Sequence, residues 1–314
     1  MFTIFRKEIA DHFHSVRFLI LFCLILCVAL LTTNMVAMNL RSELAGGSKI
    51  EYIFLMLFTT SGQFFSLTQF IAFFGPLIGI IMGFDAINRE RTGGTLSKLL
   101  SQPVHRDAII NGKFLAGIAT ATIMFVSLIL LISGLGMVAI GVVPGGEEVA
   151  RLVLYVIISI VYVGFWLGLA ILFSILFRSI GTSALASIAL WIFVSFFVGF
   201  GSGLIADAIA PVKGNDPDQV VKNQRLAEGI SRVSPVNLYS DATSTIMDPY
   251  RKTTKSFVLV GAMERISMSR FNNALPLPQS ILVVAPYLST LLALTAVCFG
   301  ISYLVFMRQE IRAI

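Results

Sequence analysis

The chain of 314 residues carries a formal net charge of +6, is 56% hydrophobic and only 13% charged, and has a mean hydropathy of +0.88. Soluble domains carry about 25% charged residues, so this composition excludes an ordinary soluble protein and indicates a chain that crosses a membrane several times. The basic residues lie mostly beside apolar runs, where they orient a protein in the membrane, so the positive charge does not indicate nucleic-acid binding.

Residue types that carry catalysis or bind metals are sparse in this chain. Cys23, Cys27 and Cys298 all lie inside apolar runs, so the sequence predicts neither a disulfide framework nor a metal site. It contains no phosphate-binding loop of the form Gly-x-x-x-x-Gly-Lys-Ser/Thr and no HExxH or GxSxG motif. We therefore expect no catalytic residue, metal or cofactor in this chain, and any ATP that drives it must be hydrolysed by a separate polypeptide.

Residues 1–17 are predicted to form an amphipathic elbow helix that lies along the membrane interface. Five apolar residues are spaced by three and four positions, which places them on one face of a helix. They are Phe2, Phe5, Ile9, Phe13 and Val16.

Six apolar runs are long enough to cross a hydrocarbon core, which needs about 20 residues. We expect spans over Phe18–Leu40, Phe65–Phe84, Phe114–Val143, Leu152–Phe177, Ser183–Ala206 and Ile281–Met307. The charge-free run from Tyr52 to Phe84 is longer than one span needs, so a short interfacial piece is expected before the second span. Glu147, Glu148 and Arg151 are expected in a short loop between the third and fourth spans.

Glycines recur at every fourth position in two of the predicted spans. Gly75, Gly79 and Gly83 lie in the second span, and Gly164 and Gly168 lie in the fourth. Because this GxxxG pattern lets another helix approach closely, we expect these glycines at helix-packing faces.

Residues 207–280 are richer in charge and proline than the spans around them. We expect a large extracytoplasmic segment here, either a small soluble subdomain or a set of helices lying on the membrane. Pro217–Val233 and Asn237–Met247 are predicted helices, and Ser256–Met268 is expected to rest on the bilayer surface. The predicted organisation is therefore residues 1–17, 18–206, 207–280 and 281–314.

The positive-inside rule orients these spans. Basic residues concentrate on the side that carries both termini and the stretch at residues 85–113. They are Arg6, Lys7, Arg17, Arg89, Arg91, Lys98, Arg106, Lys113, Arg178, Arg308 and Arg312, against Arg41, Lys49 and Arg151 in the two short loops opposite. Both termini and residues 85–113 are therefore predicted to be cytoplasmic.

The polar stretch at residues 85–113 separates the second and third spans. Within it a short amphipathic helix is predicted, because Thr95 can cap its start after two glycines and Pro103 ends it. Its apolar stripe consists of Leu96, Leu99 and Leu100. A further helix is predicted to begin near Arg106 and to continue into the third span. From the residues alone, two interpretations of this helix stay open. It is either an ordinary interfacial helix whose basic side chains snorkel to the membrane surface, or a docking surface for a soluble partner.

The run from Asn88 to Lys113 resembles the signature of type-2 ATP-binding-cassette (ABC) permeases. In that family, acidic and basic residues precede a Gly-Thr-Leu, a Leu-Leu-Ser-x-Pro, an Arg and a Gly-Lys that enters the third span. The matching residues here are Glu90 and Arg91, Gly94-Thr95-Leu96, Leu99-Leu100-Ser101-Gln102-Pro103, Arg106 and Gly112-Lys113. This sequence departs from the family pattern at Gly93, where many members carry a bulkier or charged residue.

The resemblance implies a coupling helix that inserts into a groove on a cytoplasmic ATPase subunit. Arg89, Glu90 and Arg91 would contact the rim of that groove, and the leucine stripe would be its buried part or face lipid. The resemblance also implies two copies of an ATPase that binds ATP and Mg, a second identical or similar permease chain, and the plasma or inner membrane of a prokaryote.

Three functions are compatible with the sequence. The spans hold almost no ionisable groups, which favours an ABC exporter whose substrate is amphipathic or lipid-like over an ion-coupled carrier. Polar residues near the outer leaflet that could line its path, or merely bond between helices, are Asn34, Gln63, Thr68 and Gln69. An alternative is a mechanotransducer of the metalloenzyme-maturation type, which acts on an extracytoplasmic protein through residues 207–280. An alternative of another class is a secondary transporter or membrane enzyme.

Overall fold

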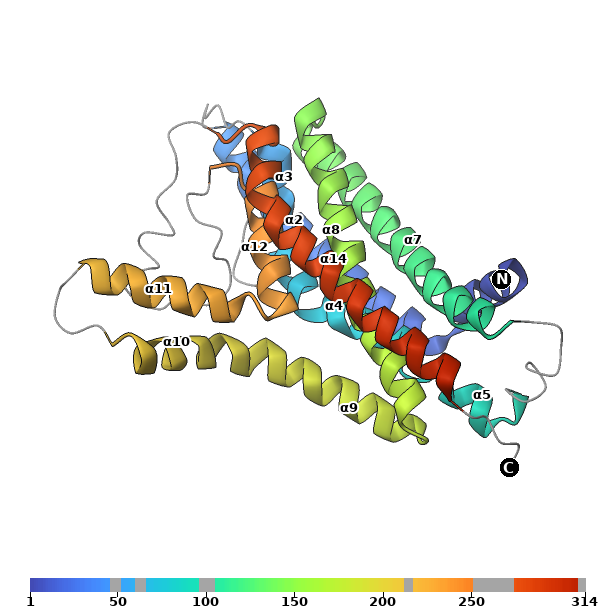
Figure 1. Ribbon diagram of the computed structural model, residues 1–314. Coiled ribbons are helices and arrows are strands. Elements are labelled where there is room, and N and C mark those ends of the chain that lie inside the picture. Colours follow the sequence, from blue (N-terminus) through green and yellow to red (C-terminus); the bar gives the residue numbers. More distant parts are fainter. Residues whose placement is uncertain (46–51, 60–65, 96–104, 212–216, 251–273, 310–314) are drawn as a thin grey trace.

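The computed structural model describes residues 1–45, 52–59, 66–95, 105–211, 217–250 and 274–309 (Figure 1). Within these residues the chain forms helices and no β-strand. Six helical segments are long and apolar enough to cross a membrane. The predicted all-α fold with six membrane spans is therefore confirmed.

The helices follow the predicted order, and most extend a few residues beyond the predicted span. They are α1 (Phe2–His14), α2 (Val16–Ala45), α3 (Ile53–Thr59), α4 (Leu67–Gly83), α5 (Asn88–Thr92), α7 (Arg106–Ile140), α8 (Gly146–Leu176), α9 (Ile180–Ile192), η1 (Phe193–Phe197), α10 (Val198–Ile209), α11 (Pro217–Ser231), α12 (Pro235–Met247) and α14 (Leu277–Arg308).

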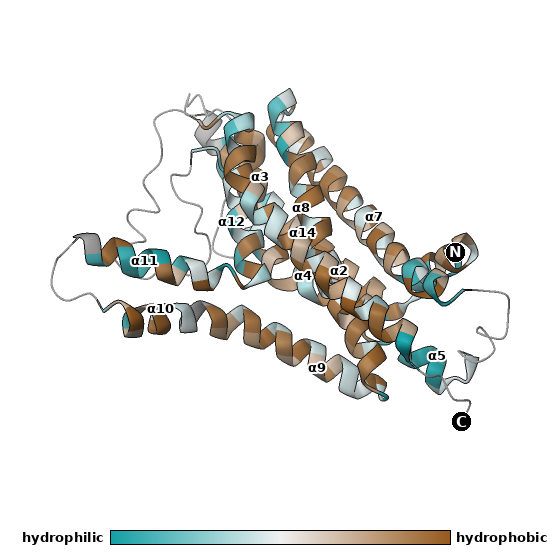
Figure 2. Ribbon diagram, viewed as in Figure 1, coloured by the Kyte–Doolittle hydropathy of each residue, from teal (hydrophilic) through white to brown (hydrophobic). Residues whose placement is uncertain are grey.

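The bundle is built around α8, which contacts α4, α7, α12 and α14. Three large aromatic residues of α8 are fully buried among these neighbours, namely Tyr155, Tyr162 and Trp166. Figure 2 shows apolar residues over most of the long helices, whereas hydrophilic residues gather on α5 and α11 at the periphery. This distribution is the one expected when a helix bundle is solvated by lipid.

The long helices run between two ends of the bundle (Figure 1). We name the end that carries α1, α5 and Gln309, where α14 stops, the basal end. The opposite end, where α7 is connected to α8, is named the distal end.

The fifth predicted span is one interrupted helix that diverges from the bundle. α9 passes into α10 through the π-helical segment η1, and α11 then returns beside α10 (Figure 1). Leu185, Phe193 and Phe197 on this segment are 55–70% exposed, so much of its apolar surface has no protein neighbour within the described residues. A π-helical turn changes the register of a helix, which changes the faces that α9 and α10 present.

α12 departs from the expectation that residues 207–280 form a separate soluble subdomain or a set of helices lying on the membrane. The predicted helices α11 and α12 are present, but α12 packs within the bundle against α4, α8 and α14. Tyr239 of α12 is fully buried and stacks on Tyr162, with ring centroids 4.2 Å apart, and its hydroxyl is 2.8 Å from Ser159 Oγ. The predicted surface helix at Ser256–Met268 lies outside the described residues.

The expected loop containing Glu147, Glu148 and Arg151 is also corrected, because these residues form the first turns of α8. The carboxylate of Glu148 accepts from the backbone N–H of Gly145 and of Phe54, at 2.8 and 3.0 Å. Acidic groups at a helix start satisfy its free N–H groups and its dipole, which extends α8 past the predicted boundary.

The buried Arg151 joins three helices at the distal end. Its guanidinium donates to the carbonyl oxygens of Ile246 and Leu275 at 2.8 and 2.6 Å and to Glu147 Oε1 at 2.8 Å. Because these partners lie on α8, at the end of α12 and just before α14, one side chain holds α12 inside the bundle.

Candidate functional site

The candidate site is the basal end around α5, the short helix that precedes residues 96–104. Two backbone N–H groups at the start of α5, those of Ile87 and Asn88, donate to Ser174 Oγ at 3.0 and 3.1 Å. The side-chain amide of Asn88 donates to the carbonyl of Ser179 at 3.3 Å. α5 is therefore fixed to the last turn of α8 and to the residue that precedes α9.

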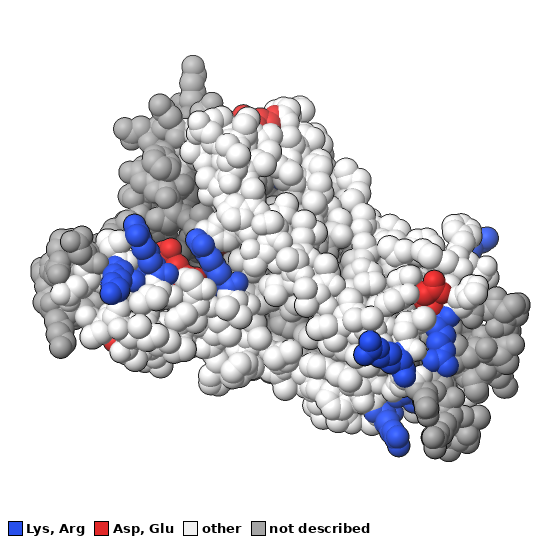
Figure 3. Space-filling model, in the orientation of Figure 1, with Lys and Arg blue, Asp and Glu red and all other residues white. Residues whose placement is uncertain are grey.

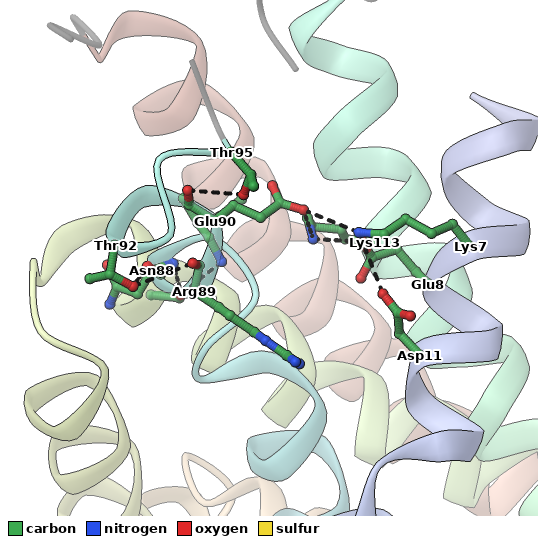
Figure 4. A network of polar contacts seen from close by, with 11 residues as sticks. Lys7, Glu8, Asp11, Asn88, Arg89, Glu90, Thr92, Thr95 and Lys113 are labelled. Atoms are coloured by element: carbon green, nitrogen blue, oxygen red, sulfur yellow. Dashed lines mark hydrogen bonds and ion pairs between the residues drawn. The ribbon is translucent and has the colours of Figure 1, made fainter. Parts of the chain in front are cut away.

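A buried ion-pair network joins α5 to α1 and α7 (Figure 4). Lys113 Nζ lies 2.8 Å from Glu8 Oε1 and 2.9 Å from Glu90 Oε1. The side chains of Lys113, Glu90 and Glu8 are only 5%, 9% and 10% exposed. One lysine near the start of α7 thus compensates two carboxylates that would be costly to bury alone.

Lys7 extends this network toward solvent. Its ammonium lies 3.3 Å from Glu8, 3.4 Å from Asp11 and 3.7 Å from Glu90, and its side chain is 55% exposed. Burial opposes ionisation of Glu8, but the ammonium of Lys113, helped by Lys7, outweighs burial and lowers the pKa of Glu8 below its ordinary value. Glu8 is therefore ionised at neutral pH, which keeps the network charged.

α1 packs on the bundle through a mixed face and not through the whole predicted apolar stripe. Glu8 is buried, Phe5 and Ile9 are half-buried, and Phe2 and Phe13 are 75% and 42% exposed. α1 packs closely on α7, because a Cβ atom at Gly112 would come within 3.0 Å of Ile4. An elbow helix with this arrangement fits between lipid and the basal end.

Two arginines connect α5 and α7 to the end of α14. Arg91 Nη2 donates to Gln309 Oε1 at 2.8 Å, and Arg106 Nη1 donates to the Gln309 carbonyl at 2.9 Å. Arg17 at the start of α2 forms an ion pair with Asp85 at 3.0 Å. The segment between α4 and α7 therefore contacts the basal ends of α1, α2, α8 and α14.

The predicted docking residues fall into different environments. Arg89 is exposed and remains available at a rim, and Arg91 is partly buried against Gln309. Glu90 was predicted to contact the rim, and the structure corrects this prediction, because its carboxylate is buried and pairs with Lys113. A lysine buried here without a carboxylate partner would be costly. Leu96, Leu99, Leu100 and Pro103 lie outside the described residues, so the coupling helix itself stays a prediction.

The end of α5 is shaped by Gly94 and Thr95. Gly94 has φ = +64°, a left-handed conformation that favours glycine, and it follows the C-cap at Gly93. The Thr95 hydroxyl donates to the Glu90 carbonyl at 3.2 Å. Thr95 thus bonds back to α5, a role that the predicted capping of a following helix did not include.

The predicted glycine faces lie where other helices approach. A Cβ atom at Gly79 would come within 2.6 Å of the Val163 carbonyl, and one at Gly83 within 2.7 Å of Ala170, so both glycines lie against α8. Gly75 lies against the Tyr162 ring. A Cβ atom at Gly164 would come within 2.9 Å of Ile118, and one at Gly168 would lie 3.7 Å from Phe114 and Phe299.

Sequence reasoning missed the partners of Lys113. The sequence marked Lys113 only as part of a Gly-Lys pair that enters the third span, and it gave no role to Glu8. The one available signal was a lysine placed well inside a predicted helix that continues into an apolar run, because such a residue needs a counter-charge.

Comparison with known proteins identifies the family. The profile of the family described as ABC-2 family transporter protein matches residues 2–311, which is almost the whole chain. The chain belongs to the ABC-2 transporter family. The resemblance to type-2 ABC permeases is thereby confirmed, and this ABC-2 protein is the membrane subunit of an ABC transporter and a multi-pass membrane protein. Family membership implies a partner ATPase subunit.

A relative is similar over a short stretch of this ABC-2 permease. The probable ABC transporter permease protein NosY of Pseudomonas aeruginosa is 46% identical over 50 residues. The matched stretch covers 16% of this chain and 18% of the relative, so less than a fifth of the length of that protein is compared.

Proposed function

We propose that this ABC-2 permease couples ATP hydrolysis by separate cytoplasmic ATPase subunits to the export of an amphipathic or lipid-like substrate. The observation that carries the proposal is the network at the basal end. The segment between α4 and α7 is bonded to α1, α2, α8 and α14, and it leads directly into residues 96–104, where the coupling helix is predicted.

The chemistry of this network suits the transmission of force. Lys113 is paired with Glu8 and Glu90 away from water, where separating opposite charges costs far more than at a surface. A displacement of α5 would therefore move α7 and α1 with it instead of breaking the pairs. Motion at the predicted docking surface would reach several spans at once.

The proposed assembly contains two ATPase copies, which bind ATP and Mg, and a second permease chain that is identical or similar. The basal end would face the cytoplasm of a prokaryotic cell, in the plasma or inner membrane. This orientation rests on the positive-inside rule, and the clustered basic side chains near α5 support it (Figure 3).

A first experiment tests docking. We expect the Leu96→Asp and Leu99→Asp double variant to lose co-purification with the ATPase and to lose permease-stimulated ATP hydrolysis, because charges would disrupt an apolar contact. A matched control is Val221→Asp on α11, whose side chain is 45% exposed at a distance from α5. If the double variant assembles and stimulates hydrolysis as the wild type does, the coupling role is refuted.

A second experiment separates coupling from docking. Glu90→Gln keeps the shape of the side chain but removes the charge that pairs with Lys113. We expect the ATPase to remain bound while substrate-stimulated hydrolysis falls by roughly tenfold, the equivalent of about 1.4 kcal/mol. Unchanged stimulation would show that the network does not transmit the motion.

A second candidate function is mechanotransduction to an extracytoplasmic partner protein. The observation that favours it is the α10–α11 pair, which lies apart from the bundle and exposes Lys222, Arg225 and Arg232 (Figures 1 and 3). Reversal of these three charges to Glu should abolish capture of an acidic partner and leave the ATPase bound. Loss of both would count against this function.

A further inference from the structure

The turn between α11 and α12 lies against two membrane spans. The guanidinium carbon of Arg232 is 5.3 Å from the centroid of the Tyr287 ring, and Ser234 Oγ donates to the Val194 carbonyl at 3.4 Å. Tyr287 belongs to α14, the last span, and Val194 belongs to η1 in the fifth span. The turn is therefore packed beside the spans and does not lie in a loop above the membrane.

Two helix lengths place this turn inside the hydrocarbon region. Tyr287 is ten residues past Leu277, where α14 begins at the distal end, which corresponds to roughly 15 Å along the helix. α12 runs for 13 residues from the turn to the distal end, which corresponds to roughly 20 Å (Figure 1). Because a hydrocarbon core is about 30 Å thick, Arg232 lies well below the distal surface of the membrane.

Hydrogen bonds fix the backbone of the turn. The N–H of Ser234 and the side-chain amide of Asn237 both donate to the Ser231 carbonyl, at 3.0 and 3.3 Å. Ser234 Oγ accepts from the N–H of Asn237 at 3.5 Å, and Pro235 occupies the first turn of α12. The position from which Arg232 projects is therefore defined before any ligand binds.

The guanidinium of Arg232 has no carboxylate partner among the residues that the structure describes. Its side chain is exposed, and the next residue, Val233, is 68% exposed. A guanidinium is always charged and offers five N–H donors, and the face of the Tyr287 ring attracts the charge without satisfying those donors. An exposed arginine at this depth therefore calls for an anion.

The depth of the site selects the class of anion. A small soluble anion or an acidic protein would have to leave water to reach Arg232, which is costly, whereas an amphiphile keeps its chains in lipid and brings only its headgroup to the site. Apolar surface for such chains is present nearby, because Phe197 of η1 and Leu204 of α10 are 61% and 72% exposed. Arginine binds phosphate and carboxylate groups through two parallel hydrogen bonds.

A second cation lies on the same side of α11. Arg225 is two helical turns before Arg232 and is also exposed, and Figure 3 shows basic side chains gathered over α11. The structure gives Arg225 no carboxylate partner within its described residues either. The positive charge therefore continues from the turn toward the outer end of α11.

We propose that Arg232 binds the anionic headgroup, a phosphate or a carboxylate, of an amphiphile that reaches it from the surrounding lipid. Arg225 supplies a second positive charge farther along α11. The binding stands on the geometry of the turn, and only its extension to the exported substrate rests on the function proposed above.

Binding is tested by thermal unfolding of the purified full chain in a neutral detergent. Phosphatidylglycerol is compared with phosphatidylcholine of the same acyl chains and with water-soluble glycerol phosphate. We expect phosphatidylglycerol to raise the unfolding temperature in a saturable way, and the other two compounds to have little effect. No ATPase is present, so failure of this binding is distinguishable from failure of the proposed coupling to ATP hydrolysis.

Two variants and a control make the test specific. Arg232→Gln should weaken the apparent affinity for phosphatidylglycerol by about tenfold, and Arg232→Lys by less, because lysine keeps the charge but not the paired hydrogen bonds. Without lipid, both variants should unfold close to the wild-type temperature, since they lose only the contact with Tyr287. Arg178→Gln, which removes an exposed arginine at the basal end, should bind as the wild type does.

The proposal is overturned if phosphatidylcholine stabilises the wild type as much as phosphatidylglycerol does, or if glycerol phosphate alone reproduces the effect. Equal loss of affinity in Arg232→Gln and Arg178→Gln also overturns it, because the effect would then be general surface charge. Gel filtration covers the remaining occupant. A smaller assembly for Arg232→Gln would assign Arg232 to a contact between two copies of the chain and not to an amphiphile.

Discussion

At the scale of single residues, the basal end depends on the charge balance around Lys113. The Lys113 side chain is 5% exposed, and its ammonium contacts one carboxylate from α1 and one from α5. The three groups come from three separate parts of the chain, so no local interaction holds them together. Their geometry is stable only because each charge is compensated away from water.

Lys113→Met is expected to destabilise the protein by about 3 kcal/mol, because it leaves the buried Glu8 and Glu90 with only the half-exposed Lys7 as a counter-charge. The measurement is the midpoint of thermal unfolding in detergent. Adding Glu8→Gln and Glu90→Gln to Lys113→Met should recover much of the loss. Lys222→Met on the exposed face of α11 is the matched control. Equal stability of Lys113→Met and the control would contradict the assigned role.

The lowered pKa of Glu8 predicts a pH dependence for the attachment of α1. The pKa of Glu8 in the folded protein lies below the ordinary value of 4.5. Ionised Glu8 therefore stabilises the folded state fully above pH 4.5, and this contribution is lost as the pH falls through the lowered pKa. We expect hydrogen exchange in α1 to accelerate below about pH 4.5. Glu8→Gln should remove this acceleration, and a variant that retains it would show that another group is responsible.

His12 needs to be separated from this effect. Desolvation is the main cause that lowers the pKa of His12 below 6.5, so the folded protein favours the neutral imidazole. The folded state is therefore destabilised as the pH falls below 6.5 and His12 has to become protonated. The pH series for Glu8 is therefore best measured in a His12→Gln background. In that background the change that begins near pH 6.5 should disappear while the change at lower pH remains.

At the scale of elements, the contact of α4 with α8 sets how closely the central helices approach. Gly79 faces backbone atoms of α8, and no flexible side chain intervenes to absorb an added methyl group. Gly75 faces the Tyr162 ring instead, at 3.0 Å from the position of an added Cβ. The three glycines of α4 therefore differ in how much substitution they tolerate.

Gly79→Ala is expected to cost about 2 kcal/mol or more, because its Cβ would lie 2.6 Å from the Val163 carbonyl oxygen and 2.7 Å from the Leu167 nitrogen. Gly75→Ala should cost less, since a ring can shift more easily than backbone. Thermal unfolding and gel filtration in detergent measure both. Gly134→Ala in α7 is the control, because nothing lies within 4 Å of its added Cβ. Similar stability of the Gly79 and Gly134 variants would exclude close packing at Gly79.

At the scale of the whole molecule, the chain places both described ends at the basal end of the bundle (Figure 1). Six spans return the chain to the side on which it began. The Arg151 network at the distal end and the Lys113 network at the basal end therefore lie toward opposite faces of the membrane.

Cysteine labelling in intact cells tests this arrangement. In a background where Cys23, Cys27 and Cys298 are replaced by alanine, Arg89→Cys should react with a membrane-impermeant maleimide only after the cells are opened. Val143→Cys, in the α7–α8 connection and 76% exposed, should react in intact cells. The reverse pattern would invert the proposed orientation, and labelling of both in intact cells would exclude the six-span arrangement.

Much of the fold could be predicted from the sequence, because a helix that crosses lipid must be apolar and long enough to span the hydrocarbon core. The six spans, α1, α11 and α12 follow from apolar runs and helical spacing. The boundary of α8 was missed because Glu147 and Arg151 look like loop residues until their partners on other helices are known. The place of α12 was missed because its serines and threonines indicate a water-facing helix, whereas their hydroxyls bond to its own backbone.

The sequence by itself determined the family, the number of spans and the position of the segment that leads to the predicted docking surface, because these depend on hydrophobicity and on residues adjacent in the chain. Only the tertiary structure decided which charges are buried together at the basal end and which carbonyl groups surround Arg151 at the distal end. Glu8 and Lys113, or Arg151 and Leu275, are far apart in sequence. Their interaction energies exist only once packing removes water and fixes the distance between them.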